Sequence, residues 1–241
     1  MYSFKNDYSE GAHPRILNAL MESNLKQTEV YGEDYYTKKA IKLLKQRIKR
    51  NDIDIHLLSG GTQTNLTAIS AFLRPYEAAI AANTGHIFVH ETGAIEATGH
   101  KVISIKVNDG KLSPSRIEPV LNTHGDEHMV KPRLVYISDP TEMGSIYTKN
   151  EIQQLSKFCI KNGLLLYVDG ARLGSALCSE ENDIELSDLG RLVDSFYIGG
   201  TKNGALIGEA PVKIHLKRIF DSILNRKGHC LRKEGFSEYS F

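Results

Sequence analysis

The segment SFYIGGTKNG, residues 195–204, places a lysine directly after an apolar, strand-like run and two glycines. A lysine at this place has no helical face to occupy, and Gly199 and Gly200 allow the backbone to approach a ligand closely. The amine of Lys202 has the chemistry to bond a carbonyl carbon as a Schiff base, while the Thr201 hydroxyl can donate to a phosphate. A surface lysine after a turn has the same pattern, so this segment alone does not distinguish a Schiff-base lysine from a surface lysine.

A second candidate site is the glycine loop SGGT, residues 59–62, between a predicted strand and a predicted helix. The helix carries Asn65 in its first turns and an apolar face beyond it. Backbone N–H groups and the positive end of the helix dipole converge at such a junction, which makes Gly60, Gly61 and Thr62 a candidate anion site. A purely structural turn explains the two glycines equally well.

A carboxylate, Asp169, closes the apolar run LLLYV at residues 164–168. Burying a carboxylate there is unfavourable unless a cation or hydrogen-bond donors meet it. Two cations fit: Arg172, three residues further on, or the protonated nitrogen of a pyridine ring in a cofactor. Because Asp169 lies between the glycine loop and Lys202 in the chain, we favour the cofactor interpretation.

These residues need a framework of alternating strands and helices. Uninterrupted apolar strands that alternate with helices indicate a parallel sheet covered on both faces. The predicted strands cover residues 54–58, 79–81, 86–89, 102–107, 134–138, 164–168 and 195–198. The predicted helices begin at Pro14 and after Thr62, and cover residues 36–47, 91–97, 113–122 and 149–162. Loops at the carboxyl ends of such strands form the ligand crevice, so we expect a common site formed by His86, Thr141, Glu142, Asp169, Arg172 and Lys202.

Composition narrows the class of protein. The chain has 241 residues, 41% of them hydrophobic, which is enough for one large domain with a substantial core. A net charge of +1 gives no bulk attraction to nucleic acid or to an anionic membrane. Scattered cysteines, no signal-peptide pattern and no membrane-length apolar run indicate a cytoplasmic protein. His124 and His128 lie in a polar loop, where we expect no metal site.

Five segments together carry a family resemblance, and they occur in the order LLSGGTQTNL, HIFVHETGAIEATGHKV, PTEMGSIY, LLLYVDGARLGSAL and SFYIGGTKNGALIGE. From about Asn6 to Leu224 the chain resembles the threonine aldolase/β-eliminating lyase family. Its members are pyridoxal-phosphate enzymes of fold type I. The resemblance therefore implies an α/β large domain like that of aspartate aminotransferase, with a mostly parallel sheet and helices on both faces.

The resemblance also implies roles at the cofactor. Lys202 would bind pyridoxal 5'-phosphate covalently, Asp169 would pair with the pyridine nitrogen, and His86 would stack on the ring. The residues that match the family's phosphate-binding positions are Gly60, Gly61, Thr62 and Thr201. Taken singly, His86 fits a core histidine and the glycines fit a turn, but their joint occurrence favours the cofactor roles.

The implied reaction is the retro-aldol cleavage of a β-hydroxy amino acid, with L-threonine or L-allo-threonine as the default substrate. Arg172 would bind the substrate carboxylate, and Asn6 falls where the family often has a serine with the same task. The general base would be His86 or a water near Glu91. Tyr31 would also bind the substrate. It lies in a loop that resembles the family's YGDD segment, which comes from a neighbouring subunit, so we expect a dimer or tetramer.

The last residues depart from the family. We expect residues 1–224 to form the cofactor-binding large domain and residues 225–241 to be an atypical tail in place of the small C-terminal domain. A shift of one nucleotide, with suitable codons, can convert this tail to KQKGALLAKGRFLRIQF, which resembles the family's continuation. We therefore hypothesise a frameshift, which the coding DNA would test; a divergent native tail is the alternative.

Two other functions stay open at this point. The chain fits a truncated, non-catalytic remnant that binds pyridoxal phosphate weakly or only self-associates. It also fits, less well, another fold-type-I enzyme such as an aminotransferase or a β-eliminating lyase, which shares the lysine and the aspartate. Product analysis separates these functions, because an aldolase gives glycine and an aldehyde whereas the other enzymes give a keto acid.

Overall fold

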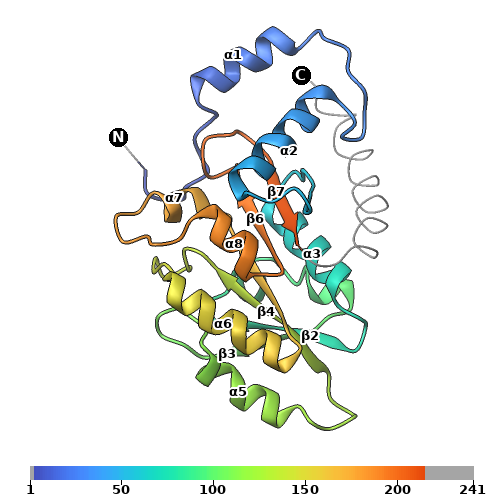
Figure 1. Cartoon of the computed structure of the whole chain (residues 1–241), viewed down its shortest axis with the longest axis vertical. Coiled ribbons are helices and arrows are strands. Elements are labelled where there is room, and N and C mark those ends of the chain that lie inside the picture. The colour runs from blue at the N-terminus through green and yellow to red at the C-terminus, as the bar shows by residue number, and fades with distance from the viewer. Residues whose placement is uncertain (1–2, 215–241) are drawn as a thin grey trace.

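The computed structural model describes residues 3–214, in which seven strands form one sheet (Figure 1). The strands lie in the order β1-β7-β6-β5-β4-β2-β3. Their bounds are β1 Asp54–Ile55, β2 Glu77–Ala82, β3 Val102–Ile105, β4 Lys131–Ser138, β5 Leu165–Asp169, β6 Ser195–Gly199 and β7 Glu209–Lys213. The prediction for the tail, residues 225–241, lies outside the described residues.

Most of the sheet is parallel, as predicted. Strand β2 pairs in parallel with β3 and β4, β4 with β5, and β5 with β6. Only the edge formed by β7 and β1 is antiparallel. The central strands β4, β5 and β6 therefore point their carboxyl ends to the same edge of the sheet.

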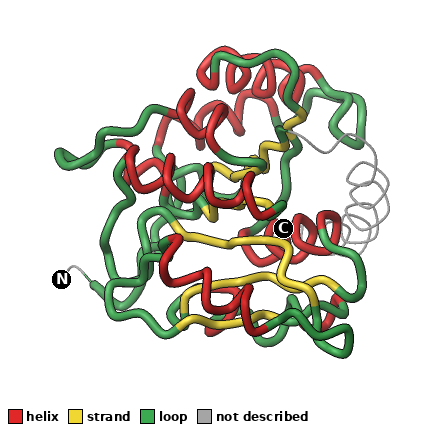
Figure 2. Tube along the Cα trace, turned by 60° about the horizontal axis from the view of Figure 1, so that its bottom comes forward, coloured by secondary structure: helices red, strands yellow, loops and turns green. Residues whose placement is uncertain are grey.

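Helices cover both faces of the sheet (Figure 2). One face packs against α2, α5, α6 and α8, and the other packs against α3 and α4. Alternate residues of each strand supply the two core clusters: Ile80 and Val168 belong to the first, whereas Ala81 and Tyr167 belong to the second. The helix bounds are α1 Pro14–Ser23, α2 Tyr35–Ile48, α3 Gly61–Phe72, α4 His86–Val89, α5 Pro114–Thr123, α6 Lys149–Asn162, α7 Leu173–Leu177 and α8 Leu186–Leu192.

The ends of α6 illustrate how local sequence fixes an element. The Thr148 side chain accepts from the Glu151 backbone N–H, and the Glu151 side chain accepts from the Thr148 backbone N–H. This capping box satisfies donors that the first turn of a helix leaves free. At the other end Gly163 adopts a left-handed conformation, with φ of 64°, which glycine tolerates without strain. The prediction of a helix over residues 149–162 is confirmed.

Helix α1 differs from the others because none of its residues is buried. It lies at the end of the molecule opposite α5 (Figure 1), and Leu17, Leu20 and Met21 are exposed. Its start is as predicted, with His13 as the N-cap and Pro14 as the first residue. Among residues 3–214 no helix is long and apolar enough to cross a membrane.

Two predictions around residue 90 are wrong. Residues 86–89 form the short helix α4 rather than a strand, because the chain turns at Gly85 and the N–H groups of Val89 and His90 bond back to Gly85 and His86. Residues 91–97 were expected to be helical, but only a 3₁₀ turn over Glu96–Thr98 forms. Strand β1 is also shorter than predicted, with a single bridge at Leu58 beyond it.

Candidate active site

A cavity of about 260 Å³ opens at the carboxyl edge of the sheet, where the loops after β2, β4, β5 and β6 meet. The predicted residues that line it together are Gly60, Gly61, Thr62, His86, Glu142, Asp169, Arg172, Thr201 and Lys202. They come from five separate segments of the chain, and the parallel direction of the strands brings them to one place. Thr141, also expected at this edge, is buried and does not line the cavity.

Asp169 forms one wall of the cavity and is only 4% exposed. Its Oδ2 accepts from the Tyr136 hydroxyl at 2.5 Å and from Asn65 Nδ2 at 2.9 Å. Its Oδ1 accepts from the Tyr197 hydroxyl at 2.6 Å and from the Ala171 backbone N–H at 3.0 Å. Burial, and next the charge of Asp169, raise the pKa of both tyrosines well above the usual value, so both hydroxyls stay protonated donors. Four donors thus surround the carboxylate, an environment suited to an anion.

The alternative of a salt bridge between Asp169 and Arg172 is wrong, because Arg172 pairs with another carboxylate. Its Nε and Nη2 atoms contact the two carboxylate oxygens of Asp7, the second pair at 3.1 Å. Partial burial works to raise the pKa of Asp7, but the hydrogen bond and charge of Arg172 outweigh it and the pKa is lowered. The pair holds the N-terminal segment at the mouth of the cavity, where the next residue, Tyr8, also lines the wall.

Lys202 reaches the cavity from the turn after β6. Its pKa is lowered, first by burial and then by the positive charge of Arg172. Its Nζ lies 5.8 Å from the centre of the Tyr8 ring. A lowered pKa increases the fraction of neutral amine at a given pH, and the neutral amine is the nucleophile.

His86 sits at the start of α4, with its imidazole in the cavity wall and its backbone N–H donating to Glu142 at 2.9 Å. The His86 Nδ1 lies 2.9 Å from Oε1 of Glu91, whose side chain is buried behind the imidazole and does not line the cavity. This hydrogen bond is the largest cause that raises the pKa of His86, and it outweighs the opposing effect of burial. Glu91 therefore controls the charge of His86 without facing the cavity.

The N-terminus of α3 also lines the cavity. Its N-cap, Gly60, has extended backbone and no side chain that caps the helix. The first N–H groups of the helix thus point into a space lined by Gly60, Gly61 and Thr62. A Cβ at Gly61 would lie 3.1 Å from the Tyr197 hydroxyl oxygen, so a side chain there would crowd a donor to Asp169.

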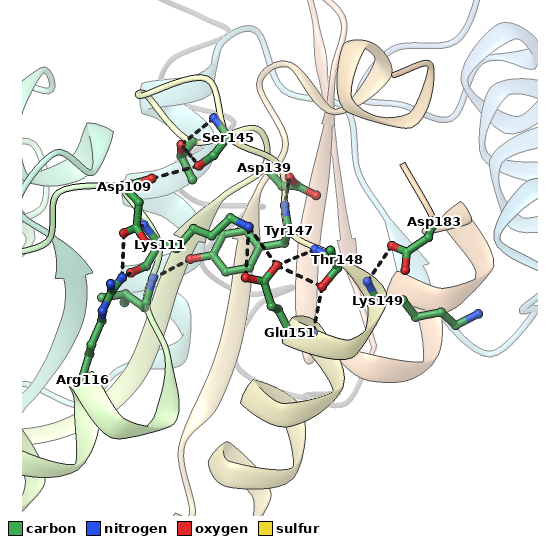
Figure 3. Close-up of polar contacts among 12 residues, drawn as sticks. Asp109, Lys111, Arg116, Asp139, Ser145, Tyr147, Thr148, Lys149, Glu151 and Asp183 are labelled. Atoms are coloured by element: carbon green, nitrogen blue, oxygen red, sulfur yellow. Dashed lines mark hydrogen bonds and ion pairs between the residues drawn. The ribbon is translucent and has the colours of Figure 1, made fainter. Parts of the chain in front are cut away.

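A polar network that includes Asp139, Tyr147 and Glu151 anchors the loop after β4 (Figure 3). Asp139 accepts from the Tyr147 N–H at 3.1 Å, and the Tyr147 hydroxyl accepts from the Leu112 N–H at 2.7 Å. Lys111 bonds Glu151 at 2.8 Å, which ties this network to the start of α6. The same loop carries Glu142 at the cavity, so the network fixes the partner of the His86 backbone.

Two predicted substrate-binding residues do not reach the cavity within this chain. Asn6 is exposed, and its Oδ1 accepts from the Tyr8 N–H at 3.1 Å and the Ser9 hydroxyl at 2.6 Å, which forms a local turn. Tyr31 lies in the loop between α1 and α2 with φ of 62°. Their roles stay predictions. Among the described residues no group of His, Cys, Asp and Glu side chains could hold a metal ion.

Several residues of the site were not predicted. Asn65 links Asp169 to Glu91, and Asp7 pairs with Arg172. The signal for Asn65 was present, because it is a polar residue on the helical face that also carries Leu66 and Ile69. No signal pointed to Asp7, which lies 165 positions from its partner.

Comparison with known proteins shows the family to which the chain is similar. Residues 10–230 match the model of the β-eliminating lyase family. The low-specificity L-threonine aldolase of Pseudomonas aeruginosa is 33% identical over 213 residues, which cover 86% of this chain and 60% of that protein. The solved threonine aldolase of Leishmania major is 50% identical with a TM-score of 0.92, over 95% of this chain and 67% of that one. An Escherichia coli aminotransferase, 15% identical with a TM-score of 0.71, over 93% of this chain and 57% of that one, shares the fold.

The fold defines the class: the chain has the fold-type-I fold of pyridoxal-phosphate-dependent enzymes, which it shares with the L. major threonine aldolase. Within this class the chain belongs to the β-eliminating lyase family. It spans about 60% of the length of the P. aeruginosa relative.

Proposed function

We propose that this protein is a pyridoxal-phosphate-dependent lyase that cleaves L-threonine or L-allo-threonine to glycine and acetaldehyde by a retro-aldol reaction. The observation that carries the proposal is the meeting of Lys202, Asp169, His86 and the N-terminus of α3 around one cavity. The threonine aldolases among its relatives support the choice of reaction.

The chemistry of the cavity fits pyridoxal phosphate. The uncapped N-terminus of α3 and the Thr201 hydroxyl suit the phosphate, and the buried carboxylate of Asp169 suits a protonated ring nitrogen. The half-buried amine of Lys202, with its lowered pKa, suits covalent attachment to an aldehyde. When bound, the cofactor supplies an electron sink for bond cleavage at Cα.

The remaining residues act on the substrate and its protons. The Arg172 guanidinium binds the substrate carboxylate through an edge that Asp7 leaves open, because Asp7 contacts only Nε and Nη2. His86 is placed to accept the proton of the β-hydroxyl at Nε2, since its Nδ1 lies against Glu91. The carboxylate of Glu91 stabilises the imidazolium that results.

Self-association is part of the proposal. Leu17, Leu20 and Met21 of α1 are exposed, and a second copy of the chain would cover them. Sedimentation of the purified protein as a dimer or tetramer would support self-association, and a monomer would contradict it.

We also propose a cytoplasmic location, consistent with unpaired Cys159 and Cys178 among the described residues.

Product analysis tests the reaction. The protein with added pyridoxal phosphate is incubated with each threonine stereoisomer, and glycine, acetaldehyde and 2-oxo acids are measured. Glycine and acetaldehyde in equal amounts, absent in Lys202→Ala, are expected. A 2-oxo acid would indicate an aminotransferase or β-elimination, and no product with bound cofactor would indicate a non-catalytic remnant.

A further inference from the structure

Asn65 connects two parts of the cavity wall, Asp169 and the His86–Glu91 pair, through buried polar contacts. It lies on α3, four residues after the start of the helix, and is 0% exposed. Its Nδ2 donates to Asp169 Oδ2 at 2.9 Å and to Glu91 Oε1 at 2.7 Å. Its Oδ1 accepts from the Tyr167 hydroxyl at 3.0 Å. One side chain thus contacts both buried carboxylates of the site.

The side-chain chemistry of asparagine suits this position closely. A primary amide carries two N–H donors and one acceptor oxygen, and here each donor meets a carboxylate while the oxygen meets a hydroxyl. A carboxylate only accepts, so the amide has a single orientation that satisfies all three partners. Aspartate at this place would remove both donors, and an apolar residue would leave two buried carboxylates facing a side chain that cannot bond them.

Each carboxylate that Asn65 holds faces a different functional group. Asp169 faces the cavity, and Glu91 contacts the His86 imidazole at 2.9 Å. We propose that Asn65 is a positioning residue that fixes the cofactor-facing carboxylate Asp169 and the His86–Glu91 pair relative to each other. The catalytic meaning of this role rests on the proposed function, whereas the coupling itself is a property of the protein without cofactor.

The two carboxylates depend on Asn65 to different degrees. Asp169 keeps three other donors, from Tyr136, Tyr197 and Ala171. Glu91 has fewer partners: within the described part of the chain its Oε2 is buried without a hydrogen bond, and Oε1 contacts only Asn65 and His86. Loss of the amide therefore frees Glu91 to turn away from His86.

The pKa of His86 is sensitive to the position of Glu91. The groups that face it are Glu91, Asp169 and Lys202, together with Glu142 at its backbone N–H and the His90 ring at 5.6 Å. The hydrogen bond to Glu91 is the largest of the causes that raise the His86 pKa. If Asn65 holds Glu91 in place, its removal lowers the His86 pKa, although residue 65 does not contact the imidazole.

The test is an NMR pH titration of His86 in the protein without cofactor, with the signal assigned by its loss in His86→Gln. We compare Asn65→Leu and the milder Tyr167→Phe, which removes the donor to Asn65 Oδ1, with Ile69→Val, a buried apolar change one turn further along α3. The His86 pKa is expected to fall in the first two variants and to stay at the wild-type value in the control, even where Ile69→Val lowers stability.

A second readout separates positioning from folding. With pyridoxal phosphate and threonine, Asn65→Leu is expected to lower kcat by on the order of a hundredfold while KM changes little, because a small misplacement of catalytic groups costs this much. If the His86 pKa is unchanged in both variants and only stability falls, Asn65 is a packing residue and the proposal is wrong. If Asn65→Leu does not fold, Tyr167→Phe decides alone. If wild type has no aldolase activity, the titration still shows whether Asn65 couples Asp169 to the His86–Glu91 pair. Failure of the proposed function is therefore distinguishable from failure of the positioning role.

Discussion

The guanidinium of Arg172 and the carboxylate of Asp7 form a two-point ion pair that ties the N-terminal segment to the mouth of the cavity. Tyr8, the residue after Asp7, lines the cavity and lies under Lys202. The segment before α1 has no regular secondary structure. Its other contacts include Tyr8 with Lys202 and, at its end, the His13 N–H with the Gly204 carbonyl, so the ion pair is the charged contact that fixes it over the site.

We predict that Asp7→Asn and Arg172→Gln both release residues 3–12. Hydrogen–deuterium exchange of a peptide that covers these residues should rise at least several-fold in each variant, because the pair orders an otherwise irregular segment. Glu10→Gln, which neutralises an exposed acid of the same segment, should exchange like wild type. Unchanged exchange in both variants would mean that other contacts hold the segment.

Asp139 should make stability depend on pH. Burial raises the pKa of Asp139 to about 6, from an ordinary 3.8. The folded protein thus binds more protons than the unfolded chain between these values, so the contribution of Asp139 to stability is complete below 3.8 and is lost as pH rises through about 6. A shift of about 2 units corresponds to about 3 kcal/mol.

Urea unfolding of wild type, Asp139→Asn and Glu127→Gln at pH 5, 6.5 and 8 measures this effect. Relative to wild type, Asp139→Asn should gain stability as the pH increases, because an uncharged amide avoids the burial of an anion while it still accepts from the Tyr147 N–H. Glu127→Gln, in an exposed loop, should follow wild type. Parallel curves for all three proteins would contradict the raised pKa of Asp139.

Gly170, directly after Asp169, allows β5 and β6 to approach each other. A Cβ there would lie 1.8 Å from the carbonyl oxygen of Tyr197, and the Gly199 N–H donates to the Gly170 carbonyl at 2.9 Å. To relieve this clash β5 and β6 would have to move apart, which would disrupt the site. Gly170→Ala should therefore lower the free energy of unfolding by about 4 kcal/mol or prevent folding.

The control for this substitution is Gly125→Ala, where an added Cβ meets nothing within 4 Å. It should change the free energy of unfolding by less than about 0.5 kcal/mol. A soluble, stable Gly170→Ala protein would show that the strands tolerate a wider separation than the structure has.

The sequence was informative where periodicity and local chemistry agree. The apolar run before Asp169 predicted β5 to within one residue, and the helix predicted over residues 149–162 has the bounds of α6. The segment at residues 86–89 failed because three apolar residues fit a strand and a helical turn equally, and only the chain reversal at Gly85 decides between them. Strand β7 and helices α7 and α8 were not predicted.

The site was predictable in its motifs but not in its connections. Lys202, Asp169, His86 and the glycine loop each follow a strand, so topology alone brings them to one edge. The polar residue Asn65 on an apolar helix face was visible in the sequence, but its partners and those of Asp7 lie in segments that are distant in sequence, and no local pattern identifies them.

The most direct test of the central claim is an absorption spectrum of the purified protein with pyridoxal phosphate, after removal of excess cofactor. A covalent bond between the Lys202 amine and the cofactor should give a band near the edge of the visible region in wild type and in Lys106→Ala, a change at an exposed lysine outside the cavity. The band should be absent in Lys202→Ala. An equal band in all three proteins, or none in wild type, would contradict the assignment of this cavity as a pyridoxal-phosphate site.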